Sequence, residues 1–240
     1  DRRTEPPLDE TARASPMPVC PFKGLAPFEA VDADYFFGRE RLVAEIVARL
    51  VGARFLAVVG PSGSGKSSVV RAGLLPALAR GVLPGSELWR RLLMRPGEDP
   101  LAEVERRLGE VPADSSAVLA VDQFEEIFTA CRDPAERAAF IDALVGASRE
   151  DGRAVTVVVA LRADYYGACA AHPALARVLG ENHVLVGPMQ PDELASTISG
   201  PAREAGIVVE SQLVDRLIED VTGQAGPLPL LSAPLLELLQ

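Results

Sequence analysis

Apolar and β-branched residues gather in five short runs along the chain, each with the length of a buried β-strand. The runs lie at residues 55–59, 92–94, 117–121, 155–161 and 184–186. Helical patterns separate most of them, and the pattern at 134–145 places Phe140 and Leu144 on its apolar side. Strands that alternate with helices are joined by right-handed crossovers and form parallel sheets. The pattern therefore predicts an α/β fold, with a parallel β-sheet flanked by helices.

The same pattern divides the chain into three parts. Residues 1–19 are charged and proline-bearing with little apolar content, which predicts a flexible linker. The first helix is expected over 39–51, where apolar residues recur on one helical face. Near the end of the chain the patterns are helical only, at residues 192–199, 211–221 and 229–239. We therefore expect a core over 20–190 and a small helical lid over 191–240, truncated where the chain stops within an apolar helix.

A glycine-rich turn follows the first predicted strand. It has the full G-x-x-x-x-G-K-[ST] pattern, formed by Gly60, Pro61, Ser62, Gly63, Ser64, Gly65, Lys66 and Ser67. The glycines let successive N–H groups face one anion, and the helix that continues through Ser68 adds the positive end of its dipole. Lys66 would reach the β- and γ-phosphates, and the Ser67 hydroxyl would complete a Mg²⁺ shell. Strand, loop and helix in this order predict a nucleoside triphosphate site, and the alternative is a turn that binds nothing.

Acidic side chains follow the predicted strand at 117–121. An aspartate at the carboxyl edge of a parallel strand can face the phosphate loop and hold Mg²⁺, so Asp122 joins Ser67 as a metal-ligand candidate. Hydrolysis also needs a group that orients or deprotonates the attacking water, and either Glu125 or Glu126 is a candidate. The alternative is that both glutamates are solvated acids at the start of a helix, where they oppose its dipole.

The strand at 155–161 ends at Arg162, which is a candidate sensor of the γ-phosphate through a charge-assisted hydrogen bond. The alternative is a structural ion pair with Asp164 or another neighbouring acid. Arg71 is expected only to pack on its helix, and His172 and His183 are expected to be surface or packing residues. Of these arginines and histidines, only Arg162 is expected to contact the nucleotide.

Composition narrows the class of protein. The net charge is −10 and the pI about 4.8, which disfavours direct nucleic-acid binding by the chain as a whole. No uninterrupted apolar stretch approaches the roughly 20 residues that cross a bilayer. The 3 cysteines lie far apart without zinc-site spacing, which favours free thiols in a reducing cytoplasm. The chain begins at Asp1, so we expect it to be cut from a longer polypeptide.

Six motifs, in this order, resemble those of the novel STAND NTPases of bacteria, which are related to NACHT and NB-ARC domains. They occupy residues 20–25, 36–40, 60–76, 122–126, 162–167 and 226–231. The resemblance covers the chain from about residue 20 to its end. It implies a P-loop fold of the ASCE type, in which the strand ending at Arg162 lies between the strands that carry Gly60 and Asp122. It also implies an ATP/ADP switch within a larger signalling protein that has fused effector and repeat domains.

The resemblance assigns further residues to the nucleotide. Phe37, Gly38 and Arg39 match the family's segment against the adenine and ribose, and Pro229 matches the lid proline that packs on the base. Ala233 stands where the family often has histidine, so a nucleotide contact from that position is not expected.

At the phosphate end, Lys66, Ser67 and Asp122 match the family's phosphate and Mg²⁺ positions, and Arg162 matches its first sensor. The segment 122–126 also resembles the D-G-x-D-E form of NACHT proteins, which implies acidic roles for the two glutamates.

These features lead to the hypothesis of a slow, Mg²⁺-dependent ATPase that acts as a conformational switch. ATP would favour an open, self-associating state and ADP a closed one. The alternatives are a nucleotide-binding scaffold without turnover and a P-loop small-molecule kinase, and the residues alone do not exclude GTP. An ABC transporter ATPase is set aside because no LSGGQ-like segment precedes Asp122.

Overall fold

The computed structural model describes residues 20–149, 154–222 and 227–237. A five-stranded parallel sheet lies at its centre, in the order β2-β3-β4-β1-β5. The strands are β1 (Phe55–Gly60), β2 (Arg90–Met94), β3 (Ser116–Val121), β4 (Ala154–Arg162) and β5 (His183–Leu185). All five apolar runs are therefore strands, and β4 lies between β1 and β3 as predicted. The parallel pairing aligns Gly60 with Arg162, which brings the phosphate loop and the candidate sensor to one edge of the sheet.

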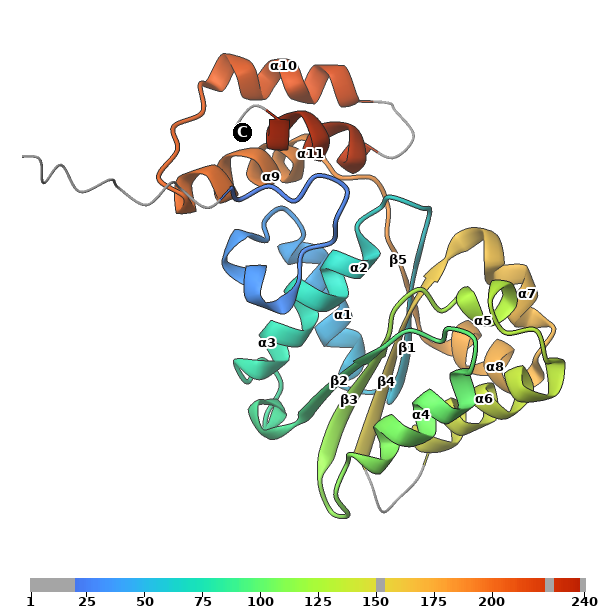
Figure 1. Cartoon of the computed structure of the whole chain (residues 1–240). Coiled ribbons are helices and arrows are strands. Elements are labelled where there is room, and N and C mark those ends of the chain that lie inside the picture. The colour runs from blue at the N-terminus through green and yellow to red at the C-terminus, as the bar shows by residue number, and fades with distance from the viewer. Residues whose placement is uncertain (1–19, 150–153, 223–226, 238–240) are drawn as a thin grey trace, which may run out of the picture.

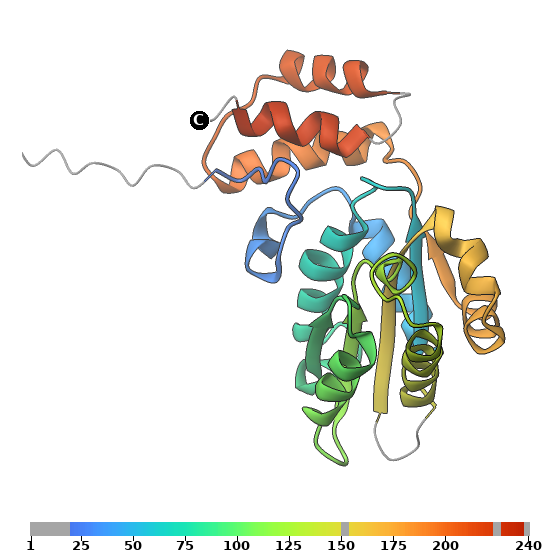
Figure 2. The ribbon, with the colours of Figure 1, turned by 45° about the vertical axis from the view of Figure 1, so that its right-hand side comes forward.

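Helices cover both faces of the sheet (Figures 1 and 2). One face carries α1 (Glu40–Leu50), α2 (Lys66–Ser68) and α3 (Leu75–Ala79). The other carries α4 (Pro100–Gly109), α5 (Glu126–Thr129), α6 (Pro134–Ala147), α7 (Tyr166–Ala170) and α8 (Pro173–Glu181). In β1, Leu56 and Val58 pack toward the first layer, and Ala57 and Val59 toward the second. Because both faces are buried, the central strands are continuously apolar rather than alternating.

The helix after the phosphate loop changes geometry along its length. A π-helical segment, η2 (Val69–Leu74), joins α2 to α3, and the Leu75 N–H donates to the Val70 carbonyl five residues earlier. Pro76 follows directly, and a proline in a regular α-helix lacks one N–H donor and clashes with the carbonyl four residues before it. The wider turn accommodates Pro76 without ending the helix, and it changes which side chains share a face.

Three helices form a separate layer beyond the carboxyl ends of the strands (Figure 1). They are α9 (Pro191–Glu204), α10 (Ser211–Val221) and α11 (Pro227–Glu237). Their apolar cluster includes Ile198 and Leu231, and it also contains Phe22 from the N-terminal segment. That segment contains the short helix η1 (Ala30–Tyr35) and runs between the lid helices and the helix after the phosphate loop (Figure 2). We interpret α9 to α11 as the lid predicted from residue 191.

Some predicted boundaries differ from the structure. The α9 helix was expected to end at residue 199, but it continues to Glu204. Pro201 within it is buried, and Ala202 belongs to the lid cluster. The last strand begins one residue earlier than predicted. The predicted linker at 1–19 and the end of the last predicted helix lie outside the described residues. Within the described ranges, no helix is both long enough and apolar enough to cross a membrane.

Candidate functional site

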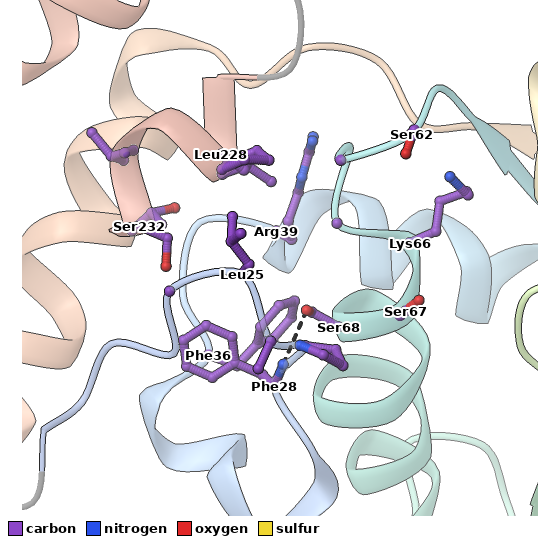
Figure 3. A pocket seen from close by; sticks show the side chains of 18 of the residues that line it. Leu25, Phe28, Phe36, Arg39, Ser62, Lys66, Ser67, Ser68, Leu228 and Ser232 are labelled. Atoms are coloured by element: carbon purple, nitrogen blue, oxygen red, sulfur yellow. Dashed lines mark hydrogen bonds between the residues drawn. The ribbon is translucent and has the colours of Figure 1, made fainter. Parts of the chain in front are cut away.

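A cavity of about 390 Å³ opens at the carboxyl ends of the strands, the edge at which parallel α/β sheets bind ligands. The phosphate loop, the N-terminal segment and the lid contribute its walls. Figure 3 shows Lys66 and Ser67 on one side of this space, Phe28 and Phe36 below it, and Leu228 from α11 opposite the loop. Its volume lies within the range of typical small-molecule sites.

The phosphate loop depends on glycine at two positions. Gly63 and Gly65 have φ values of 73° and 86°, in the left-handed region that other residues rarely adopt. A β-carbon on Gly63 would lie 3.0 Å from Pro229 Cγ, and one on Gly65 would lie 3.0 Å from Leu228 Cδ1. The lid therefore packs directly on the loop that would hold the phosphates, and Pro229 lies where it contacts both the loop and the cavity.

The Lys66 ammonium is buried at the start of α2. Its Nζ donates to the carbonyl oxygens of Gly60 at 3.0 Å and Pro61 at 2.8 Å. Burial lowers the pKa of Lys66, and the nearby carboxylates of Glu125 and Asp122 act in the opposite direction. A phosphate at the mouth of the loop would meet this charge together with the N–H groups of the helix start.

The hydroxyl and the carboxylate predicted to hold a metal are in direct contact. Ser67 Oγ donates to Asp122 Oδ1 at 2.8 Å, and the Gln123 N–H donates to the same oxygen at 3.0 Å. In the described part of the chain, no group of three or more His, Cys, Asp or Glu side chains could hold a metal ion. Mg²⁺ needs no such group when water and phosphate oxygens complete its shell, so this pair of hard oxygen donors fits that ion.

Arg71 has a different environment from the one predicted. Its Nε and Nη2 lie 3.0 Å and 2.8 Å from Asp122 Oδ2, and its Nη1 pairs with the Glu29 carboxylate. The prediction that Arg71 only packs on its helix is wrong. Arg71 lies in the π-helical turn, and it fixes the orientation of the buried Asp122 carboxylate, whose other oxygen faces Ser67.

The two glutamates after Asp122 lie in different places. Glu125 lines the cavity, and its Oε2 accepts the backbone N–H of Arg162 at 3.2 Å. Glu126 begins α5, is not among the residues that line the cavity, and accepts the Gly97 N–H at 3.2 Å. Only Glu125 is therefore brought together with Lys66 and Asp122.

Arg162 lines the cavity and also forms the ion pair considered as its alternative role. Its Nε and Nη2 lie 3.0 Å and 2.6 Å from the Asp164 carboxylate oxygens, and its guanidinium lies 5.5 Å from the centre of the Tyr165 ring. The hydrogen bonds between the pair raise the pKa of Arg162 and lower that of Asp164. Both side chains are substantially exposed, so this pair is weak enough to exchange partners.

The segment predicted to face adenine joins the core to the lid. Phe37 lines the cavity and packs on Gly200, where an added β-carbon would lie 2.4 Å from its ring. Gly38 does not line the cavity. It has a φ of 85°, and a β-carbon there would lie 2.3 Å from Thr197 Oγ1. Its role is therefore to permit close approach of the backbone to α9.

Arg39 lines the cavity although only 5% of its surface is exposed. Its Nη2 donates to the carbonyls of Ser64 at 3.2 Å and Gly187 at 3.0 Å. Burial lowers the pKa of Arg39, and the charge of Glu193 partly offsets this. Among the described side chains, Arg39 Nε and Ser64 Oγ are buried without a hydrogen-bond partner. Of these two residues only Arg39 lines the cavity, so its Nε is the position where a bound group would supply the missing partner.

The remaining loop residues divide between the cavity wall and its support. Ser62 and Ser68 line the cavity, and Ser68 Oγ also accepts the Phe28 N–H at 3.1 Å (Figure 3). Pro61 and Ser64 contribute backbone carbonyls to Lys66 and Arg39 rather than cavity surface.

Sequence reasoning missed several residues of the wall. These are chiefly the N-terminal residues 24–28, the lid residues 228, 231, 232 and 235, and Arg95 and Gln123. Arg95 directly follows β2, so the strand-end rule that found Asp122 and Arg162 would also have found it. The apolar wall residues gave no such signal because their side chains have no distinctive chemistry.

Solved structures of low sequence identity share this fold. The closed state of Hsp104 with ATPγS and FITC-casein matches with a TM-score of 0.60 at 14% identity, over 84% of this chain and 37% of that one. A Walker-type ATPase of Pyrococcus abyssi matches with a TM-score of 0.56 at 15% identity, over 89% of this chain and 71% of that one. ORC2 of Aeropyrum pernix in its ADP form matches with a TM-score of 0.59 at 13% identity, over 79% of this chain and 59% of that one.

At such identities the likeness shows the fold alone. This chain spans 37% of the Hsp104 chain and 59% of the ORC2 chain, less than two thirds of each. No curated protein matches the chain. The family model described as Novel STAND NTPase 1 matches residues 21–240, which include the phosphate loop, the strand ends and the lid helices. The chain therefore belongs to the Novel STAND NTPase 1 family.

Proposed function

We propose that the chain is an ATP-hydrolysing switch module of a larger signalling protein. The observation that supports this best is the convergence of Lys66, the Ser67–Asp122 pair, Glu125 and Arg162 on one cavity that the lid also lines. Phosphoryl transfer requires mainly positioning and electrostatic stabilisation, and these groups can supply both.

Each residue has a specific role in this proposal. The loop N–H groups and Lys66 bind the β- and γ-phosphates, and Ser67 and Asp122 hold Mg²⁺, which neutralises phosphate charge when it is bound. Glu125 accepts a proton from the attacking water. Arg162 exchanges Asp164 for the γ-phosphate and so detects its loss. Phe37, Arg39 and Pro229 contact the base and ribose, with ATP as the nucleotide.

Switching requires that ATP and ADP contact the two states of the lid differently. Leu228 and Pro229 pack on Gly65 and Gly63, so movement of the phosphate loop is transmitted to α11. We propose that ADP favours the packed lid, and that ATP favours an open form that self-associates. The same proposal includes slow turnover, a cytoplasmic location and fused effector and repeat domains. It does not include direct binding of nucleic acid by this chain.

The first test is to denature freshly purified protein and identify any released nucleotide by chromatography. Stoichiometric ADP would support adenine specificity and a closed state. Lys66→Ala should abolish nucleotide binding measured by titration with a fluorescent ADP analogue. Retained affinity in a folded Lys66→Ala protein would refute the assigned site.

Hydrolysis is tested by phosphate release from ATP without any acceptor. Phosphate release under these conditions distinguishes an ATPase from a small-molecule kinase and from a nucleotide-binding scaffold without turnover. Glu125→Gln should bind ATP but lower turnover by at least about 100-fold, as for other general-base losses. Glu126→Gln is the matched control, because its carboxylate lies outside the cavity wall and should leave turnover nearly unchanged.

A further inference from the structure

Gln123 has a backbone conformation that glutamine rarely adopts. Its φ is 53°, in the left-handed region, and among the described residues only Asp114 shares this feature outside glycine. Asp114 lies in an exposed turn, whereas Gln123 is half-buried and directly follows Asp122. Glycine would adopt this conformation without strain, so a side chain kept here requires an explanation.

Contacts of the Gln123 backbone explain why the chain adopts this conformation. They do not explain why the residue here carries a side chain. Its N–H donates to Asp122 Oδ1, and the chain then turns so that the Phe124 N–H donates to the Ala160 carbonyl on β4. Glycine would form both contacts equally well, since each uses only the backbone. Gln123 is among the residues that line the cavity, together with Lys66, Glu125 and Arg162.

The amide of Gln123 is available for a ligand. Within the described part of the chain, it makes no hydrogen bond to another residue. An amide has both a donor and an acceptor, so it can hold a water and a phosphate oxygen at the same time. The neighbouring carboxylates can only accept, and the arginine can only donate.

We propose that Gln123 is a further catalytic residue of this chain, an inference that rests on the proposed ATP hydrolysis. Its Oε1 accepts a hydrogen bond from the attacking water, and its Nε2 donates to a γ-phosphate oxygen. The water oxygen forms a bond to the γ-phosphorus, and the bond from that phosphorus to the β–γ bridging oxygen breaks. The bridging oxygen leaves with the electron pair as part of ADP. The water proton passes to Glu125, and inorganic phosphate is the second product.

Gln123→Gly tests the side chain while it relieves the backbone. We expect an unfolding midpoint at or above that of the wild type, ADP affinity within about 2-fold, and single-turnover phosphate release lowered by roughly 100-fold, the lower end of the effect of a positioned catalytic group. Asp114→Gly is the matched control, because it relieves the same backbone conformation far from the cavity and should leave turnover unchanged.

A second measurement follows trapping of ADP with aluminium fluoride, which resembles the transferring phosphoryl group. Gln123→Gly should weaken this trapping by at least about 10-fold while ADP alone binds normally, because the lost contacts belong to the transition state. Wild-type turnover in Gln123→Gly, or equal loss of ADP affinity and trapping, would overturn the inference. A wild-type protein that binds ATP without releasing phosphate would also overturn the inference on Gln123. A wild-type protein that binds no nucleotide would instead refute the proposed function itself.

Discussion

Replacing Arg71 by methionine should destabilise the protein strongly, because it leaves a buried carboxylate without its cation. Asp122 is 1% exposed and the Arg71 side chain 10% exposed, and two guanidinium nitrogens lie within 3.0 Å of Asp122 Oδ2. Removing one partner of a buried pair costs about 3–5 kcal/mol, since the remaining charge has lost both water and its counter-ion. An exposed pair would cost only about 0–1 kcal/mol.

The second partner of Arg71 contributes much less. The Glu29 side chain is 45% exposed, so water replaces the guanidinium when that contact is lost. For a domain of this size, each kcal/mol lowers the unfolding midpoint by roughly 2–4 °C. Arg71→Met should therefore lower the midpoint by about 6–20 °C, and Glu29→Gln by at most about 4 °C.

Thermal unfolding followed by circular dichroism, without added nucleotide, measures both variants. The double variant Arg71→Met with Asp122→Asn removes both buried charges and should recover much of the lost stability. A midpoint for Arg71→Met within about 2 °C of the wild type would refute the reasoning, since that is the effect of a surface pair. A double variant no more stable than the single one would show that packing, rather than the uncompensated charge, dominates.

Two further predictions concern packing and protonation. Gly200→Ala places a β-carbon 2.4 Å from the Phe37 ring, so it should lower the unfolding midpoint by several degrees. Gly180→Ala is the control, because Gly180 also lies within a helix but has open space around it, and its midpoint should not change. Burial raises the pKa of Cys169 from 9.0 to about 12, so in the folded protein at pH 8 it should resist iodoacetamide, as read by peptide mass spectrometry. The stability that this thiol contributes is complete below about pH 9 and is lost as the pH rises toward 12, because the unfolded chain releases its proton first.

The sheet could be predicted because its central strands are buried on both faces, which makes each one a continuous apolar run. The order of the strands did not follow from that pattern, which is the same for any arrangement of parallel strands. The resemblance to a family placed only the strand that ends at Arg162, between the strands that carry Gly60 and Asp122. The edge positions of β2 and β5 follow from the structure. The register that aligns Gly60 with Arg162 then follows from the structure alone.

Patterns within a short segment gave the wrong prediction where contacts between residues distant in sequence determine the structure. Gly200 and Pro201 resemble a helix end, yet α9 passes through both of them. Phe37 packs on Gly200, and Pro201 is buried. Arg71 has the spacing of an ordinary helical residue, but the π-helical turn before Pro76 directs it toward Asp122. Neither outcome has a signal within the segment itself.

The adjacent glutamates show a similar limit at the site. The sequence offered Glu125 and Glu126 equally, because both follow a strand end and both can start a helix. Their side chains diverge where α5 begins, so that one accepts the Arg162 N–H beside the cavity and the other the Gly97 N–H outside its wall. The start of a helix is uncertain by one or two residues from sequence, and here that uncertainty was enough to leave the assignment open.

The proposed switch requires that loss of the γ-phosphate change the position of the lid. Two sets of contacts connect the phosphate site with the lid. One runs through the phosphate loop, where Pro229 packs on Gly63. The other begins at the metal end, where Asp122 pairs with Arg71 and Arg71 with Glu29. Glu29 belongs to the N-terminal segment, whose Phe22 is buried in the lid cluster. Because the second set does not pass through the phosphate loop, we propose that a change at Asp122 shifts the lid equilibrium even when the contact between Gly63 and Pro229 is unchanged.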